Sequence, residues 1–117
     1  MKNYEILDAL SKLNKIKEST TKYPVSLGYK IYKNIGVLEK SLEPYEKMRS
    51  EIFTKYSNGK DSITPEDDCY FEVMNEIKEL GNQEVEDISL SYISLDEFKD
   101  LNFSMEEIMG LSVMIKE

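Results

Sequence analysis

Apolar residues recur at three- and four-residue intervals along much of the chain, which is the spacing of helices with one buried face. The first such stretch predicts a helix over residues 4–18, with Asn3 as its cap. The second is longer and predicts a helix over residues 25–56. Its stripe comprises Ile31, Ile35, Leu38, Leu42, Tyr45, Ile52 and Tyr56. Because this apolar face is so long, we expect an equally long element to lie against it.

Pro44 lies inside the long stripe. A proline in a helix interior removes one backbone hydrogen bond and clashes with the preceding turn, at a cost of about 3 kcal/mol. We therefore expect either a kink at Pro44 or two helices placed end to end.

A turn and a third helix follow. Asn58-Gly59 is the strongest turn dipeptide in the chain. Thr64 with Pro65 behind it is typical of a helix start, because threonine caps the helix and proline suits its first position. The pattern predicts a helix over residues 65–81, packed antiparallel on the long helix.

The period then changes from helical spacing to strict alternation. Apolar residues alternate with aspartate and serine over residues 85–93, which predicts a strand with one buried face. Ile88, Leu90 and Tyr92 would form that face. A strand needs a partner, and the candidates are residues 60–63, the terminal SVMIK segment at 112–116, and the same strand of a second subunit.

The last part of the chain contains a short repeat. SLDEFKDL at 94–101 and SMEEIMGL at 104–111 each open with Ser-x-x-Glu, the capping box in which serine and glutamate satisfy two backbone amides. The repeat predicts short helices over residues 95–101 and 105–111. Met105, Met109 and Met114 are interpreted as core filling, and the alternative is an adaptable surface for a partner.

These elements predict a single domain over residues 1–117. The expected fold class is α+β and predominantly helical: a long antiparallel helical hairpin with a short β-strand and two short C-terminal helices.

Composition argues against most catalytic chemistry. The chain contains no histidine and one cysteine, Cys69, whose acidic neighbours would not activate a thiolate. Carboxylates occur in runs typical of solvated faces, and no phosphate-binding loop is found. We expect a non-enzymatic protein without a metal or cofactor. Since no segment has about 20 consecutive apolar residues and the N-terminus does not resemble a secretory signal, we also expect a cytoplasmic protein without a membrane span.

Charge is distributed unevenly along the chain. Residues 1–60 contain 12 Lys and Arg against 7 Asp and Glu, a net charge of +5, whereas residues 61–117 contain 3 against 16, a net charge of −13. One explanation is that the two halves fold against each other. The others are that the basic half recognises an anion or an acidic partner, or that the acidic half imitates nucleic acid. At a pI near 4.7, general nucleic-acid binding is not expected.

The segment from residue 22 to 37 has no acidic side chain, and it supplies the candidate binding residues Lys22, Tyr29, Lys30, Tyr32, Lys33 and Asn34. In one interpretation the tyrosines border a packing face while the lysines and Asn34 face solvent. In the other, free amides of residues 26–28 at the helix start and the lysines bind a small anionic nucleotide, with a tyrosine stacked on its base.

The Lys-Tyr-Pro-Val sequence at 22–25, the stretch YKIYKNIGVLEKSLEPYEKMR, the Asn-Gly turn and the closing SLDEFKDLNFSMEEIMGLSVMIKE resemble a family of small uncharacterised proteins of phages and prophages of Gram-positive bacteria. The resemblance implies an accessory protein in the cytoplasm of an infected host cell. We therefore expect a homo-oligomer that binds a host protein in counter-defence or host takeover. The alternatives are a protein that sequesters a small anionic nucleotide signal and a minor virion assembly factor.

Overall fold

The computed structural model describes residues 1–19, 22–57, 59, 61–98 and 101–116. Its elements in chain order are α1 (Asn3–Lys17), α2 (Val25–Ser57), α3 (Tyr70–Gly81), β1 (Ile93–Ser94), the 3-10 helix η1 (Leu95–Phe98), α4 (Met105–Leu111), the 3-10 helix η2 (Ser112–Met114) and β2 (Ile115–Lys116). The predicted class, predominantly helical α+β, is confirmed.

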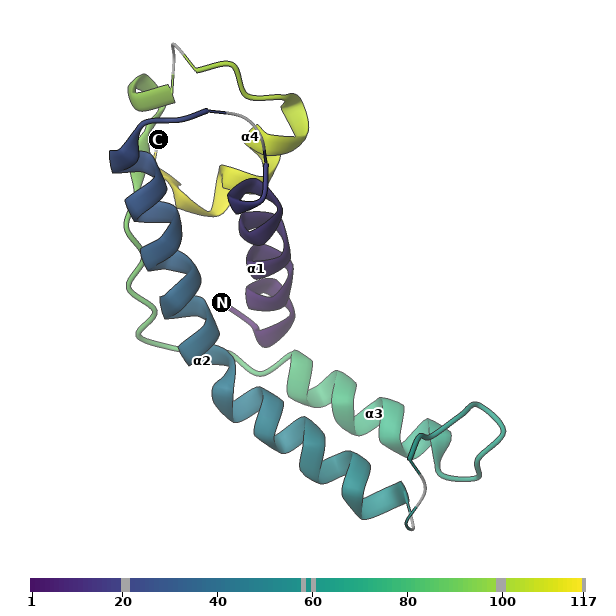
Figure 1. Cartoon of the computed structure of the whole chain (residues 1–117). Helices are drawn as coiled ribbons and strands as arrows, with labels where there is room; N and C mark the ends of the chain where they lie inside the picture. The colour runs from purple at the N-terminus through teal and green to yellow at the C-terminus, as the bar shows by residue number, and fades with distance from the viewer. Residues whose placement is uncertain (20–21, 58, 60, 99–100, 117) are drawn as a thin grey trace.

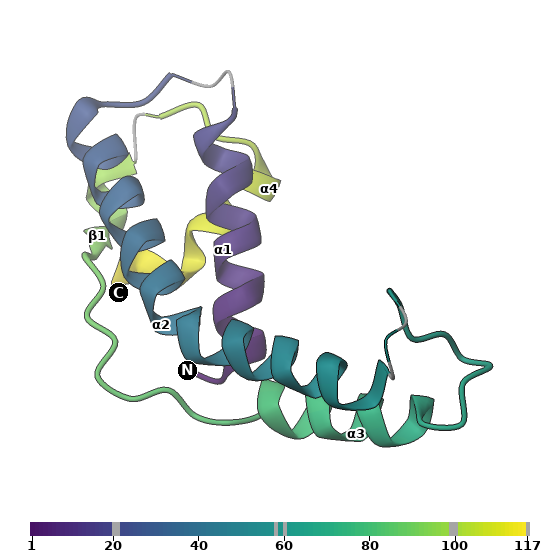
Figure 2. The same ribbon diagram turned by 60° about the horizontal axis from the view of Figure 1, so that its bottom comes forward.

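The molecule has two parts that meet at an angle (Figures 1 and 2). The body contains α1, the first half of α2, α4 and the paired strands. The arm is residues 45–81, which form the second half of α2, α3 and their connection. The radius of gyration is 17.6 Å, whereas a compact chain of this length would have about 13 Å. The excess reflects the projecting arm.

The body holds the main hydrophobic core. Helix α1 and the first half of α2 face each other across it, and the C-terminal part of the chain covers it from one side (Figure 1). The buried apolar residues are Ile6, Ala9, Leu10, Leu13, Ile16, Leu27, Ile31, Ile35, Leu38, Leu42, Tyr45, Ile93, Leu111 and Met114. The first predicted stripe and the part of the second from Ile31 to Tyr45 therefore form the core where the two helices meet, while Ile52 and Tyr56 are half-buried in the arm.

Helix α2 is covered by two shorter helices. It has 33 residues, whereas α1 has 15 and α3 has 12. Helix α1 packs against its first half and α3 against its second half (Figure 2). The prediction of one equally long element was wrong, because two short helices together provide the length.

Helix α2 is continuous through Pro44 and changes direction at about half its length (Figure 1). Proline removes a backbone hydrogen bond in this region, and the Ser41 hydroxyl donates to the carbonyl of Val37 at 2.8 Å in the turn before. The predicted kink is thus present, and the alternative of two separate helices is excluded.

The connection between α2 and α3 differs from its prediction. Gly59 has a φ of 85°, as a turn glycine would, while Asn58 lies outside the described residues. The backbone amide of Thr64 donates to the carboxylate of Asp67 at 2.7 Å, so these residues close a turn of their own. Helix α3 begins only at Tyr70. The predicted start at residue 65 was wrong. The Asp67 carboxylate accepts from the Thr64 amide and closes a separate turn, and Thr64 does not cap a helix that begins at Pro65.

The predicted strand over residues 85–93 is mostly extended chain outside any strand. At its end, Ile93 and Ser94 pair in parallel with Ile115 and Lys116 of the terminal segment. At its start, the amide of Val85 donates to the carbonyl of Met1 at 2.7 Å, beside an isolated antiparallel bridge between Lys2 and Glu84.

Val85, Ile88 and Leu90 pack on the core, but the alternation is interrupted between Val85 and Ile88, where Glu86 and Asp87 are both exposed and Asp87 has a φ of 60°, outside the extended range of a strand. The apolar residues of this segment lie against helix α2, whose backbone groups are already hydrogen-bonded within the helix, so it cannot pair with them as a strand would. Tyr92 is exposed and Ile93 takes the buried position instead.

The two serine-capped segments differ from each other. Helix α4 has the predicted bounds, and both halves of its capping box form between Ser104 and Glu107. The predicted helix over residues 95–101 is confined to η1, where the amide of Ser94 donates to Glu97 at 2.9 Å. Residues 99–100 lie outside the described part.

The start of α1 is fastened to the end of α3. Asn3, predicted as a cap, is buried and donates to the carbonyl of Leu80 at 2.8 Å. The Tyr4 hydroxyl donates to the carbonyl of Ile77, and the Tyr4 ring lies directly on Gly81. A Cβ at position 81 would overlap this ring. The junction of body and arm therefore depends on a residue without a side chain.

We predict that Gly81→Ala lowers the free energy of unfolding by about 2 kcal/mol, because its methyl group displaces the Tyr4 ring. Urea unfolding followed by circular dichroism measures this change. Gly36→Ala is the matched control, since nothing lies near a Cβ at that exposed helical position. The control should be more stable than the natural chain by about 0.5–1 kcal/mol. Equal stabilisation by both substitutions would contradict the Tyr4 contact.

Candidate binding surfaces

The structure separates the six predicted binding residues. Lys22, Tyr29, Tyr32 and Lys33 are exposed, Lys30 is half-buried and Asn34 is buried. The six residues therefore do not share one surface, and the four exposed ones stay a predicted binding site.

Asn34 is part of the body's structure. Its side chain donates to the carbonyl of Ser91 at 2.8 Å and accepts from the amide of Ser91 at 2.7 Å. The side-chain amide of Asn34 also donates to the sulfur of Met114 at 3.4 Å. The prediction that Asn34 faces solvent was wrong, because the extended chain needs a polar partner where it crosses α2.

Lys30 contacts the same crossing segment at the next residue, Tyr92, and also reaches Glu97. Its ammonium contacts the carboxylate of Glu97 at 3.1 Å and donates to the carbonyl of Tyr92 at 3.2 Å. The Ser94 amide, and then Lys30, lower the pKa of Glu97. A lowered folded-state pKa means that these contacts favour the folded chain at neutral pH and are lost as the pH falls through that value.

The amides predicted to bind an anion at the start of α2 are partly occupied. Those of Leu27 and Gly28 both donate to the carbonyl of Pro24 at 3.1 Å. The side of Gly28 that could approach a ligand faces the ring of Tyr23. What stays exposed nearby is Tyr29, Tyr32 and Lys33, with the ammonium of Lys17 5.4 Å from the centre of the Tyr32 ring.

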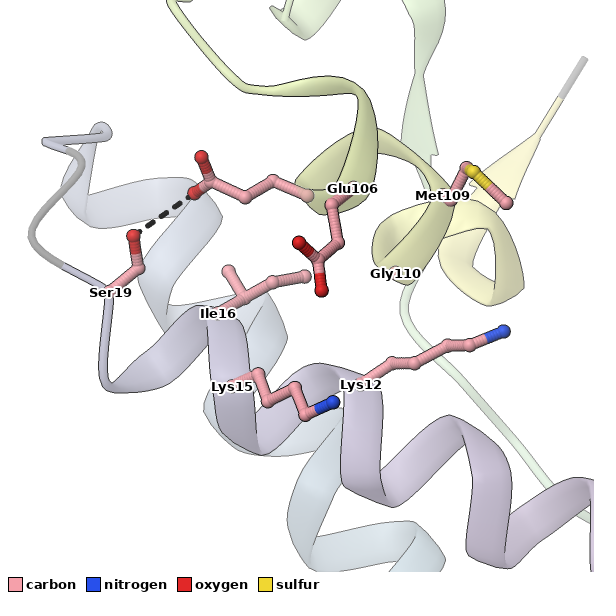
Figure 3. Close-up of a pocket in the computed structure, with 8 residues that line it drawn as sticks. Lys12, Lys15, Ile16, Ser19, Glu106, Met109 and Gly110 are labelled. Atoms are coloured by element: carbon pink, nitrogen blue, oxygen red, sulfur yellow. Dashed lines mark hydrogen bonds between the residues drawn. The ribbon is translucent and has the colours of Figure 1, made fainter.

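A cleft of about 480 Å³ lies elsewhere, between α1 and α4 (Figure 3). It forms because α4 approaches α1 closely at Gly110, where a Cβ would come within 3.0 Å of the Ile16 side chain. The lining residues are Lys12, Lys15, Ile16 and Ser19 from the α1 side and Glu106, Glu107, Met109 and Gly110 from α4.

The cleft has charges of opposite sign on its two walls. Lys15 stands on the α1 wall, and Glu106 points from α4 toward α1 (Figure 3). Neither forms an ion pair with another described residue. Lys12 is paired with Asp8 at 2.9 Å, and Glu107 both completes the α4 cap and accepts from Ser19 at 3.1 Å. Lys15 and Glu106 are thus the charges available to a ligand.

The outer face of α4 adjoins the cleft and is apolar. Met105 and Met109 are 72% and 60% exposed, and Ile108 is 39% exposed. Their spacing of three and four residues places them on one side of the helix, opposite Gly110 and Leu111. We call Met105, Ile108 and Met109 the methionine face. The interpretation of the methionines as core holds only for Met114, which is fully buried.

From the sequence, this surface is expected only as the alternative to core filling, because methionines near a chain end usually fill gaps in the core. The missed signal is Gly110, four residues before Met114 and next to Leu111. A glycine beside an apolar residue identifies the side of α4 that packs closely, and the methionines on the opposite side must then face solvent.

Other chemistry has no support in the described residues. No group of three or more His, Cys, Asp or Glu side chains among them could hold a metal ion. Cys69 is half-buried, with its thiol 3.5 Å from the carbonyl of Tyr56, in keeping with a packing role. In the part of the chain that the structure describes, no helix has the length and apolar character needed to cross a bilayer.

Comparison with protein-family models, with curated proteins and with solved structures gives no match. The resemblance to phage proteins therefore stays a prediction.

We predict that Asn34→Leu destabilises the chain by about 2–4 kcal/mol, because the part-buried amide and carbonyl of Ser91 lose their partners. Chemical denaturation measures the loss. Lys33→Leu, a similar substitution at the exposed neighbouring position, is the control and should leave stability within about 0.5 kcal/mol. If Asn34→Leu unfolds at the same denaturant concentration as this control, Asn34 does not hold the crossing segment.

Proposed function

We propose that the chain is a non-enzymatic binding protein and that a segment of a partner protein occupies the cleft between α1 and α4. The observation that carries this proposal is the methionine face, which places three exposed apolar side chains beside the cleft. Exposed apolar residues that are clustered, and not scattered, are typical of interaction sites. Methionine suits such a site because its flexible side chain adapts to different partners.

The walls of the cleft define the chemistry of the segment. An apolar side chain would pack against Met109 and Ile16. A carboxylate on the α1 side would pair with Lys15, and a cation on the α4 side would pair with Glu106. An amphipathic segment with one apolar anchor and charges of both signs meets these requirements.

The partner proposed is a host protein, and the context is an accessory phage protein acting on host defence or host machinery in the bacterial cytoplasm. The resemblance to phage and prophage proteins supports this context. The cleft and the methionine face support only the binding of a protein segment, so the identity of the host partner is left to experiment.

We predict that Met109→Asp weakens capture of the partner by about 10- to 30-fold, as expected when a charge replaces an anchoring apolar residue. The measurement is affinity purification of the tagged chain from a bacterial host lysate, followed by a binding titration with the purified partner. Met48→Asp is the matched control, because Met48 is also an exposed methionine but lies in the arm.

Unchanged binding by Met109→Asp, or equal loss in Met48→Asp, would refute a site at the cleft. A photoreactive amino acid at position 105 gives a second readout. It should cross-link to the captured partner, and the linked peptide should contain an apolar anchor with charged neighbours.

A second candidate function is the sequestration of a small anionic nucleotide. The observation in its favour is the exposed pair Tyr29 and Tyr32, with Lys17 and Lys33 beside them. A base could stack on a tyrosine ring while the lysines pair with phosphate.

We predict for this candidate that Lys33→Glu abolishes any thermal stabilisation of the chain by members of a nucleotide panel. Lys30→Glu is not a clean test, because it would also break the contact with Glu97. Lys40→Glu, a charge reversal at an exposed position of the same helix, is the control. If no nucleotide raises the melting temperature of the natural chain, this candidate is excluded.

A further inference from the structure

The arm buries little of its own apolar surface. Between residues 46 and 80, Val73 is the only described residue that is fully buried. The apolar residues along the contact of α2 and α3 are half-buried or exposed: Met48, Ile52, Phe53, Tyr56, Tyr70, Phe71, Met74, Ile77 and Leu80. Two helices alone cannot cover the apolar side chains along their contact, so at least one side of the α2–α3 hairpin lacks a third element packed against it.

An ion pair covers one side of this hairpin. Lys55 on α2 contacts Glu76 on α3 at 3.5 Å. Residues two positions apart on a helix point about 200° away from each other. Phe53 and Met74 are each two positions from a member of this ion pair, so they lie on the other side of the hairpin.

Phe71 precedes Met74 by three residues and is its neighbour on the surface of α3. Because Phe71 is also two positions before the buried Val73, it lies at the outer edge of this side, turned away from α2. It is 76% exposed, a high value for a phenylalanine. We call Phe53, Phe71 and Met74 the arm face. It is an uncovered apolar surface on the side of the arm away from the ion pair.

The charges around the arm face are ordered along the arm. Arg49 lies over the Phe53 ring at 5.1 Å, and Lys78 follows Met74 by one helical turn, so both cations flank the arm face near the body. Glu46 lies one turn before Arg49 on the same side of α2, so these three charges give this end of the arm face a net charge of +1. At the far end, residues 61–69 contain four acidic residues and no basic one. There, a hollow of about 370 Å³ is lined by Glu66, Asp67, Asp68, Tyr56, Ser57, Ile63 and Cys69.

We propose that two copies of the chain pair through their arm faces, antiparallel about a two-fold axis. In a two-fold interface the same patch is used twice, so the pattern must complement itself when reversed. The arm meets this condition, because its charges run from basic near the body, through the apolar arm face, to acidic at the far end. The acidic end of each arm meets Arg49 and Lys78 of the partner, and the arm faces cover each other at the centre.

The size of the arm limits the affinity. Helix α3 has 12 residues, a length of about 18 Å, and the arm is two helices wide. Such a face is smaller than the roughly 800 Å² per partner of a standard interface. We expect a dissociation constant on the order of 10–100 µM, rising with ionic strength because the charged ends are exposed.

Sedimentation equilibrium of the full chain over a range of concentrations tests the proposal. The natural chain should shift from monomer to dimer, and Phe71→Asp should raise the dissociation constant at least about tenfold. Tyr29→Asp is the matched control, because Tyr29 is a similarly exposed aromatic residue on the body. It should dimerise like the natural chain. A natural chain that stays monomeric up to about 1 mM would overturn the proposal.

A charge exchange tests the antiparallel arrangement. One variant carries Arg49→Glu with Lys78→Glu, and the other carries Glu66→Lys with Asp68→Lys. Each variant alone brings like charges together at both ends and should be monomeric. A mixture of the two restores opposite charges at both ends and should form a heterodimer. Asp67 is left unchanged because it closes the turn with Thr64.

If the mixture fails to associate while the natural chain dimerises, or if dimerisation is lost in Tyr29→Asp and kept in Phe71→Asp, the arm faces are not the interface. Either result leaves the cleft between α1 and α4 untouched. Conversely, a loss of partner binding in Met109→Asp does not bear on the dimer, so the two proposals fail separately.

Discussion

The length of helix α2 is the constraint on which the architecture depends. With 33 residues and a nearly continuous apolar stripe, it needs more cover than any other element can give. Helices α1 and α3 divide this task and meet end to end where α2 bends. Their meeting point is narrow because the Tyr4 ring lies on Gly81 and Asn3 reaches the backbone of α3. The bend that Pro44 introduces into α2 lies beside this joint, and the two-part shape follows from the change in direction there.

The uneven charge of the chain is explained to a large extent by this arrangement. Of the four ion pairs between described residues, three join the basic first half to the acidic second half. They are Lys30 with Glu97, Lys55 with Glu76, and the terminal ammonium of Met1 with Glu84. Exposed pairs of this kind contribute little to stability individually. Their effect is to orient the two halves and to leave the acidic loop of the arm as the largest unbalanced group.

Helices were predictable from the sequence because their apolar spacing records which side is buried. The stripe from Ile31 to Tyr45 and the capped helix after Ser104 needed no knowledge of neighbouring elements. The segment around Leu90 was not predictable in this way, because alternation shows that one side is buried but not what covers it. Here the cover is a helix, so the chain stays extended without pairing as a strand.

The candidate site was predictable only in part for a related reason. Asn34 lies on a lysine- and tyrosine-rich segment, and nothing local shows that it bonds to Ser91, which is 57 residues away. Lys30 likewise depends on Glu97. The methionine face was visible as a composition but not as a surface, since its exposure follows from how closely Gly110 approaches Ile16.

The sequence separation of the contacts indicates an order of folding. The contacts of α2 with α1 and with α3 connect elements that are neighbours in the chain, whereas the closing contacts of the body join groups far apart in sequence. Met1 bonds to Val85 across 84 residues, and Ser19 to Glu107 across 88. Because distant contacts require large loops to close, they form late. The hairpins that α2 forms with α1 and with α3 can therefore assemble first, and the arm then brings residues 82–91 back toward α1, where they and the C-terminal segment close over the body.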